Sequence, residues 1–284
     1  MYQSMIPMLE EATRLGYTVG AFNAHNLEMV PAMIGAARDA GAPIIIQISP
    51  GTARYVGMKN LVAVCRSMAE EDIVDVALHL DHATNLDDIR DAINAGFSSV
   101  MFDGSGLPFT ENVAISRRVI EFAHKRGVSV ETEIGTIGGT EEGISHETGN
   151  YTQPDEALRF VSEVDCDALA ISIGTNHGQF RGKTKLNFEL LSEINEVIDK
   201  PLVIHGGTGV NEADYPRLTA NGIRKFNVGT ELLVSWTNTA KETFGQTAVN
   251  SSLRNNIVPC NDAVRDVVAH KIGLFMKSPV PSHS

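Results

Sequence analysis

The sequence has few cysteines, no long apolar run and no excess of positive charge. Its three cysteines, Cys65, Cys166 and Cys260, are far apart and include no C-x-x-C pair. An odd number without such a pair argues against a disulfide framework and predicts buried thiols in a reducing compartment. No run approaches the roughly 20 apolar residues of a membrane-spanning helix. Glu10 and Glu11 fall where a signal peptide would be apolar, so we expect a cytoplasmic protein.

Basic residues are outnumbered, because 35 Asp and Glu against 23 Lys and Arg give a formal net charge of −12. This balance argues against sequence-independent binding to nucleic acid or to an anionic membrane, and we expect neither as a partner. The charge does not exclude an anionic substrate, since backbone N–H groups at a helix N-terminus can hold a phosphate.

What the sequence does contain is a regular alternation of short apolar runs and longer amphipathic ones. The amphipathic runs carry helix start and stop signals, such as Asn85 before one helix and Gly96 after it. The eight strand-like runs are residues 18–25, 43–49, 76–82, 98–104, 129–135, 168–174, 201–207 and 225–231. Helical crossovers between strands indicate parallel strands, because each crossover needs about a dozen residues.

Eight such units predict an α/β fold, a (β/α)8 TIM barrel, as a single domain over residues 1–284. The alternative is a doubly wound Rossmann-like sheet, but its G-x-G-x-x-G fingerprint is absent after the first strand. A further helical pattern over residues 262–276 predicts a C-terminal helical extension. The polar, glycine-rich segment 138–152 follows the fifth strand and is expected to form a lid.

The predicted strands end in polar residues, and barrel enzymes carry their chemistry at those carboxyl ends. The groups concerned are Asn23, Ser49, Asp81, His82, Asp103, Glu131, Glu133, His177, His205 and Asn227. His82, His177 and His205 follow strands three, six and seven, and three imidazoles with an open fourth position form a catalytic zinc site. Each residue alone is more often a loop or capping residue. No H-E-x-x-H motif is present, so the fold must bring the histidines together.

Two glycine-rich segments follow strands seven and eight, where barrels commonly bind phosphate. They are Gly206-Gly207-Thr208-Gly209 and Asn227-Val228-Gly229-Thr230. Glycine lets backbone N–H groups approach an anion closely. The alternative is two tight turns, but the position of two adjacent loops favours phosphate.

Together these residues resemble the class II fructose-bisphosphate and tagatose-bisphosphate aldolase family. The segments that carry the resemblance are AFNAHN (21–26), HLDHATNLDDI (79–89), SVMFDGS (99–105), VETEIGTIGGTEEG (130–143), IGTNHGQF (173–180), PLVIHGGTGV (201–210) and KFNVGTEL (225–232). They occur in order across most of the chain. Its length and the NVGTEL segment look most like the tagatose-bisphosphate aldolase branch.

The resemblance implies a reversible aldol cleavage of a ketose bisphosphate, most simply tagatose 1,6-bisphosphate, to dihydroxyacetone phosphate and glyceraldehyde 3-phosphate. One Zn²⁺ per subunit would be bound by His82, His177 and His205 and would stabilise the enediolate as a Lewis acid. Asp81 would exchange the proton of the C4 hydroxyl, and Glu141, or Glu142 beside it, would transfer the proton at the enediolate carbon. Asp103 and Glu133 match positions that support the metal.

The substrate side is implied in the same way. The residues expected to bind substrate are Asn23, Ser49, Gly178, Gly206, Gly207, Thr208, Asn227, Val228, Gly229 and Thr230. A monovalent cation, Na⁺ or K⁺, is expected near Gly178 and Gly206. We also expect a homodimer or a homotetramer.

Two departures from the tagatose-type pattern and four alternatives stay open. The chain has GGTG and NVGT where tagatose-type members commonly have GASG and NVAT, so fructose 1,6-bisphosphate or a deoxy- or sulfo-ketose phosphate is an alternative substrate. A Schiff-base aldolase needs a desolvated lysine inside the barrel, and Lys225, the strand lysine, opens its strand at the wrong end. A zinc hydrolase and an inactive accessory subunit of another aldolase are the remaining possibilities.

Overall fold

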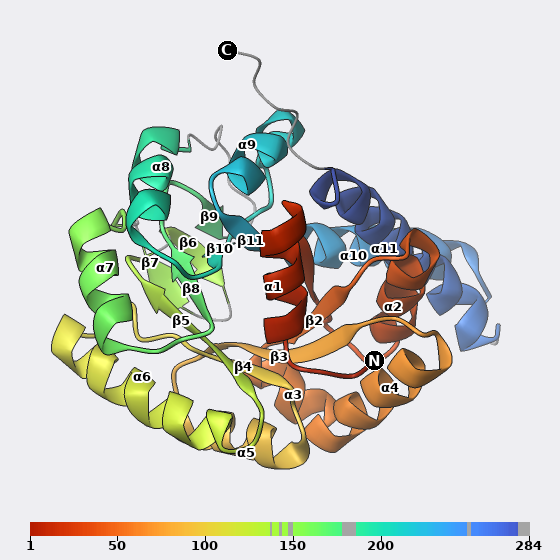
Figure 1. Ribbon diagram of the computed structural model, residues 1–284. Coiled ribbons are helices and arrows are strands. Elements are labelled where there is room, and N and C mark those ends of the chain that lie inside the picture. Colours follow the sequence, from red (N-terminus) through yellow and green to blue (C-terminus); the bar gives the residue numbers. More distant parts are fainter. Residues whose placement is uncertain (137, 142–143, 147–149, 178–185, 249–250, 278–284) are drawn as a thin grey trace.

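The computed structural model describes residues 1–136, 138–141, 144–146, 150–177, 186–248 and 251–277, with the backbone alone for 138–141, 144–146 and 176–177. Eight parallel strands close into a barrel in the order β1-β11-β10-β8-β5-β4-β3-β2 (Figure 1). These strands are β1 (Val19–Asn23), β2 (Ile44–Ile48), β3 (Val76–Ala83), β4 (Ser99–Phe102), β5 (Ser129–Ile134), β8 (Ala168–Ile171), β10 (Leu202–Ile204) and β11 (Ile223–Val228). The predicted (β/α)8 barrel is confirmed.

Helices connect the strands and surround the barrel. They are α1 (Ile6–Leu15), α2 (Met29–Ala40), α3 (Pro50–Val56), α4 (Met58–Glu71), α5 (Leu86–Ala95), α6 (Phe109–His124), α7 (Pro154–Glu163), α8 (Phe188–Val197), the 3₁₀ turn η1 (Glu212–Asp214), α9 (Tyr215–Ala220), α10 (Thr230–Gln246) and α11 (Leu253–Phe275). The predicted start signal is confirmed in α5, where the Asn85 side chain accepts a hydrogen bond from Asp87 N at 2.8 Å. Gly96 ends the same helix with a left-handed φ of 107°.

Side chains alternate between the outside and the inside of the barrel along each strand, and this gives the fold two apolar clusters. Outward-facing residues such as Ile46, Leu78 and Phe226 are fully or almost fully buried against the surrounding helices, and they form the main apolar core. Inward-facing Ala21, Ile45 and Ala77 form a second apolar cluster with residues of α1. Figure 1 shows α1 lying across the middle of the barrel. One end of the barrel is thus closed by apolar packing, which leaves the carboxyl ends of the strands for chemistry.

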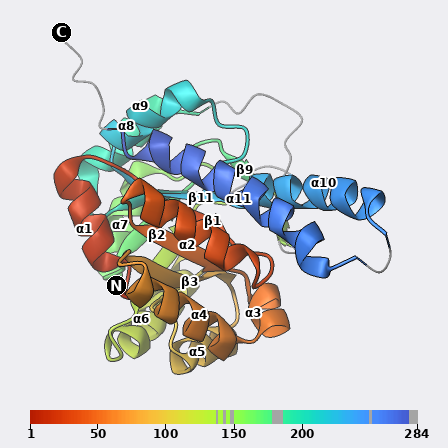
Figure 2. The same cartoon turned by 90° about the vertical axis from the view of Figure 1, so that its right-hand side faces the viewer.

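The predicted C-terminal extension is confirmed and is longer than expected. Helix α11 begins at Leu253 rather than near residue 262 and contains Pro259 in its interior. A proline removes one helical hydrogen bond, which is why sequence rules start the helix after it. Figure 2 shows α10 and α11 side by side. Phe275, near the end of α11, contacts the rings of Phe22 and Phe226.

Part of the segment predicted as a lid has strand structure. The strands β6 (Gly138–Glu141) and β7 (Ile144–His146) pair in antiparallel fashion, and β6 also pairs in parallel with β9 (Asn176–His177). The backbone of His177 therefore lies beside that of Gly139. Backbone pairing of this kind gives no strong side-chain pattern in so short a polar segment, so the sequence did not reveal it.

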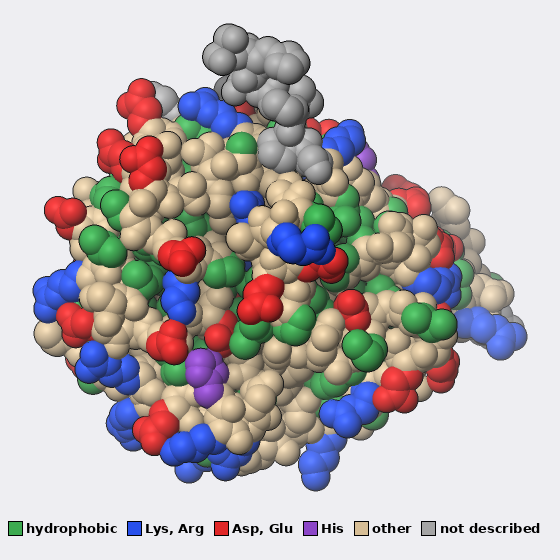
Figure 3. Space-filling model, in the orientation of Figure 1, with side chains coloured by type: hydrophobic (Ala, Val, Ile, Leu, Met, Phe, Trp, Pro, Cys, Tyr) green, Lys and Arg blue, Asp and Glu red, His purple; other side chains and the backbone are tan. Residues whose placement is uncertain are grey.

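Acidic and basic side chains are interspersed over the face shown in Figure 3. Among the described residues, no helix has both the length and the apolar character needed to cross a bilayer. The three cysteines are buried and unpaired, as predicted.

Candidate active site at the carboxyl ends of the strands

Polar side chains fill the part of the barrel interior that α1 does not close. Strand residues two positions apart face the same side of a sheet. Along each of β1, β2 and β3 the inward-facing residues therefore change from alanine or isoleucine to polar residues toward the carboxyl end. These inward-facing polar residues are Asn23, Gln47, His79, Asp81, Ser99, Glu131, Glu133, His205, Lys225 and Asn227, and all are at most 6% exposed. Buried polar groups are costly without partners. Their partners therefore define the site.

The end of β3 is irregular in a way that turns two consecutive side chains into the site. The pairing of β3 with β4 shifts register between Leu80 and Ala83, and His82 has a left-handed φ of 49°. Such a conformation costs a non-glycine residue about 1 kcal/mol or more. In a regular strand Asp81 and His82 would face opposite sides. Here Asp81 contacts β1 and β2, whereas His82 contacts residues on β10 and after β4.

His82 and His205 meet across the barrel. Their strands, β3 and β10, are four places apart in the ring of eight, on opposite walls, yet His82 Nε2 and His205 Nδ1 are 2.8 Å apart. The outer ring nitrogens face carboxylates: His82 Nδ1 lies 3.0 Å from Asp103 Oδ2, and His205 Nε2 lies 2.7 Å from Glu131 Oε1. A carboxylate accepts hydrogen bonds, so both outer nitrogens donate, and in the neutral rings the inner nitrogens present lone pairs to one point.

Asp81 lies beside this point and is held on one side only. Its Oδ2 accepts hydrogen bonds from Asn23 Nδ2 at 2.8 Å and from Gln47 Nε2 at 3.2 Å. Gln47 Nε2 also lies 3.0 Å from Asn23 Oδ1, which accepts from it. Asp81 Oδ1 is buried and has no hydrogen-bond partner among the described residues. The carboxylate is therefore fixed in orientation with one oxygen left for a ligand.

Two further carboxyl groups border the histidines. Burial would raise the pKa of Asp103, but the hydrogen bonds from His82 and Ser105 outweigh it and hold that pKa well below its usual range. Burial, reinforced by the nearby Asp103 charge, raises the pKa of Glu133 well above its usual value. Glu133 Oε2 is 3.9 Å from His205 Nδ1 and has no hydrogen-bond partner among the described residues.

These donors fit a divalent metal ion. Possible ligand atoms of Asp81, His82 and His205 all lie within 4.8 Å of one another, and so do those of His82, Asp103 and Glu133. Converging imidazole lone pairs next to carboxylate oxygens that lack partners are the donor set that zinc prefers. The carboxylates behind both rings fix their orientation, as is usual for metal-binding histidines.

The two glycine-rich segments lie side by side, because β10 and β11 are neighbours in the barrel. A Cβ at Gly207 would come within 2.2 Å of the Phe226 ring and 2.6 Å of the Asn227 carbonyl oxygen, so only glycine allows this approach. Gly229 precedes α10, and no side chain caps that helix. The first N–H groups of α10 therefore directly follow the end of β11, a position where barrels commonly bind phosphate.

The structure brings together part of the predicted set. Asn23, Asp81, His82, Asp103, Glu133 and His205 form the cluster described above, and Asn227 lies near it through Lys225. Ser49 ends β2, and its hydroxyl accepts a hydrogen bond from Thr52 N at 3.3 Å, which makes it the N-cap of α3. Gly178 and Glu142 lie outside the described residues, as do the side chains of Glu141 and His177.

Three interior residues were missed or misplaced. Gln47 contacts predicted site residues but was not predicted, and Glu131, which the sequence marks as a polar strand residue, had no role in the predicted metal or substrate site. The sequence signal for both was a polar residue in an otherwise apolar strand, two positions before a predicted site residue and therefore on the same face of the strand. The interpretation of Lys225 was wrong: β11 begins at Ile223, and the Lys225 side chain is fully buried in the barrel, with Nζ 2.9 Å from Glu131 Oε2. Lys225 and Asn227 are two residues apart in β11, so both side chains face the barrel interior.

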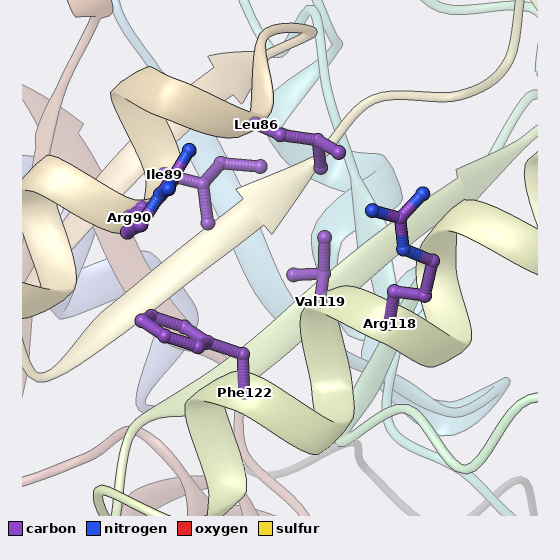
Figure 4. A pocket seen from close by; sticks show the side chains of 6 residues that line it. All are labelled: Leu86, Ile89, Arg90, Arg118, Val119 and Phe122. Atoms are coloured by element: carbon purple, nitrogen blue, oxygen red, sulfur yellow. The ribbon is translucent and has the colours of Figure 1, made fainter.

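A separate pocket lies on the outside of the barrel, between α5 and α6 (Figure 4). Leu86, Ile89, Val119 and Phe122 give it apolar walls, with Arg90 and Arg118 beside them. It contains none of the titratable groups of the barrel interior. We therefore assign the chemistry to the strand ends and not to this pocket.

Comparisons with known proteins show the family to which this chain belongs. The family model for fructose-bisphosphate aldolase class-II matches residues 3–279. The solved structure of the YdjI aldolase from Escherichia coli K12 is 31% identical over 97% of this chain and 98% of that chain, with a TM-score of 0.86. The fructose-bisphosphate aldolase of Campylobacter jejuni shares the fold at 21% identity over 96% of this chain and 95% of that one, with a TM-score of 0.79. The chain therefore belongs to the class II fructose-bisphosphate aldolase family.

Proposed function

We propose that this chain is a zinc-dependent aldolase that cleaves a phosphorylated ketose into dihydroxyacetone phosphate and an aldehyde. Family membership supports an aldol cleavage. The observation that carries the metal dependence is the approach of His82 Nε2 to His205 Nδ1, 2.8 Å apart beside Asp81. We propose His177, whose backbone lies in β9, as the third imidazole ligand.

The side chains divide the proton transfers of the cleavage. Bound zinc supplies a Lewis acid next to the substrate carbonyl. Asp81 takes the proton of the C4 hydroxyl as the C3–C4 bond breaks, C4 becomes the aldehyde carbon, and the electron pair stays on C3. Glu141 then delivers a proton to C3. Asn23 and Gln47 hold Asp81 Oδ2, so Oδ1 is the oxygen directed to the hydroxyl.

The phosphate of the three-carbon fragment is assigned to the two glycine-rich segments. Residues 206–208 and 227–230 follow neighbouring strands, and α10 begins at Thr230 without a side-chain cap. Backbone N–H groups and the positive end of the helix dipole both favour a phosphate there. The expected monovalent cation near Gly178 and Gly206 belongs to the same region.

Tagatose 1,6-bisphosphate is the proposed substrate because of the chain length and the NVGTEL segment. A coupled assay that follows release of dihydroxyacetone phosphate should compare it with fructose 1,6-bisphosphate and with deoxy- and sulfo-ketose phosphates. We expect the highest kcat/KM for tagatose 1,6-bisphosphate. A higher value for any other ketose would reassign the substrate without changing the reaction.

Metal removal tests the reaction itself. Chelation should abolish cleavage, and added Zn²⁺ should restore it. Full activity after verified metal loss would contradict the proposal, and so would a stable adduct after borohydride treatment with substrate, since that adduct indicates a Schiff base. Because Lys225 lies inside the barrel, the borohydride experiment should be repeated on Lys225→Met.

A further inference from the structure

The barrel interior contains an ion pair that the proposed cleavage does not use. Lys225 on β11 and Glu131 on β5 are both fully buried, and Lys225 Nζ lies 2.9 Å from Glu131 Oε2. The same ammonium donates a hydrogen bond to Asn227 Oδ1 at 2.7 Å. The second oxygen of Glu131 accepts from His205 Nε2 at 2.7 Å. Lys225 is thus linked to a proposed metal ligand and to a proposed substrate-binding residue.

The chemistry of the ammonium determines the orientation of both neighbours. Lysine Nζ only donates hydrogen bonds, so the Asn227 carboxamide must present its oxygen to Lys225. The Nδ2 hydrogens of Asn227 then point away from Lys225. Glu131 shares one oxygen with Lys225 and one with His205, so its carboxylate cannot rotate without breaking a contact. His205 is thereby held with Nδ1 directed at His82.

Stability alone does not account for this arrangement. Burying two charged groups costs several kcal/mol for each ion, and apolar residues of similar volume often replace such pairs at no cost in stability. The inward positions beside them on the neighbouring strands, Val203 on β10 next to Lys225 and Met101 on β4 next to Glu131, show that this interior accepts apolar side chains. A buried pair with contacts on both sides to site residues is better explained by positioning.

We propose that Lys225 is a positioning residue that fixes two groups of the active site at once. Through Glu131 it holds the His205 imidazole in the orientation that binds metal, and directly it holds the Asn227 carboxamide in the orientation that meets dihydroxyacetone phosphate. This inference rests on the proposed function, since it assigns ligand binding to His205 and Asn227.

The test measures two affinities without turnover. Zinc affinity is obtained by competition with a chelator, and dihydroxyacetone phosphate affinity by calorimetry on the zinc-saturated protein. For Lys225→Met, which keeps the length of the side chain but has no donor, we expect zinc affinity to fall about 10- to 100-fold. We expect affinity for dihydroxyacetone phosphate to fall about tenfold.

Two double-mutant cycles separate positioning from a general loss of structure. In a Glu131→Gln background, Lys225→Met should cause no further loss of zinc affinity. In an Asn227→Ala background, it should cause no further loss of affinity for dihydroxyacetone phosphate. The Glu131→Gln, Lys225→Met double variant has no formal charge at either position, so it is expected to fold even if the Lys225→Met single variant, which leaves Glu131 unpaired, does not.

Three results would overturn the inference. The first is unchanged zinc and dihydroxyacetone phosphate affinity in Lys225→Met, with or without a lower free energy of unfolding. The second and third are additive losses in either cycle, which would show that Lys225 acts independently of Glu131 or of Asn227. A wild-type protein that does not bind zinc would instead contradict the proposed function.

Discussion

His82 Nε2 and His205 Nδ1 are 2.8 Å apart although their residues lie on opposite walls of the barrel. Each ring is fixed from behind by a carboxylate, Asp103 for His82 and Glu131 for His205. Two lone pairs held at this distance repel each other unless a cation or a proton lies near both. The barrel therefore builds a candidate cation site from strands that do not pair with one another.

Replacing Asp81 tests whether it transfers a proton or binds the metal. Asp81→Asn keeps an oxygen and the size of the side chain but removes the base, so we expect zinc content to be unchanged and kcat to fall about 10²- to 10⁴-fold. Zinc content is measured by elemental analysis alongside the coupled assay. Asp87→Asn is the matched control, because Asp87 is exposed and pairs with Arg90 on the surface of α5. Loss of zinc from Asp81→Asn would make Asp81 a ligand instead.

Much of this site can be predicted from the sequence, because the alternation of apolar and amphipathic runs locates the strands and the polar residues at their ends locate the site. All eight barrel strands lie where short apolar runs alternate with amphipathic ones, and polar residues at their ends converge in the barrel mouth. His82 and His205 could be paired by this reasoning alone, since parallel strands place their carboxyl ends together. Asn85 and Gly96 marked the ends of α5 for equally local reasons.

The interior contacts were harder to predict, because they depend on where side chains meet across the barrel. Lys225 is near the start of β11, and its long side chain crosses the barrel to reach Glu131 on β5, a strand that does not pair with β11. The left-handed backbone of His82 has no local signal either, because glycine or asparagine usually marks such a conformation. The small sheet of β6, β7 and β9 joins β6 to a strand 38 residues further along the chain, since Gly138 pairs with Asn176.

Asp103 is predicted to contribute to zinc affinity through His82. Asp103 Oδ2 accepts from His82 Nδ1, while Oδ1 accepts from Ser105 N at 3.1 Å and from its hydroxyl at 2.7 Å. In Asp103→Asn the amide group must face one of these donors, so one contact is lost. We expect zinc affinity about 10- to 100-fold weaker in a chelator competition.

A second histidine–aspartate pair provides the control for Asp103. His124 Nε2 lies 2.9 Å from Asp167 Oδ2 on the outside of the barrel. Asp167→Asn therefore removes the same kind of pair away from the site and should leave zinc affinity unchanged. Equal weakening in both variants would indicate a general effect on the fold and would contradict the specific role of Asp103.

Gln47 is predicted to act through the orientation of Asp81. Its Nε2 group contacts both Asp81 and Asn23, and its side chain is fully buried. Gln47→Met keeps the volume and removes both hydrogen bonds, so we expect kcat to fall about tenfold, the size of one lost hydrogen bond to a charged group. Zinc content should not change. In the Asp81→Asn background the same substitution should cause almost no further loss, and an equal loss there would show that Gln47 acts elsewhere.

The buried thiols predict how stability depends on alkaline pH. Burial raises the pKa of Cys65 from 9.0 to about 12 and that of Cys166 from 9.0 to about 11. Both thiols stay protonated in the folded chain while they ionise in the unfolded chain above about pH 9. The folded pKa exceeds the unfolded one, so this contribution to stability is complete below pH 9 and is lost as the pH rises. Each thiol should lower the free energy of unfolding by about 1.4 kcal/mol between about pH 8 and pH 10.

Urea unfolding at the two pH values, in the presence of a phosphine reductant, measures this slope. Cys65→Ala and Cys166→Ala remove one titrating thiol each, so each should make the free energy of unfolding less dependent on pH, and the double variant least dependent of all. The cavity left by each substitution lowers stability equally at both pH values and cancels from the difference. A double variant as pH-dependent as the parent would show that groups other than these thiols control alkaline unfolding.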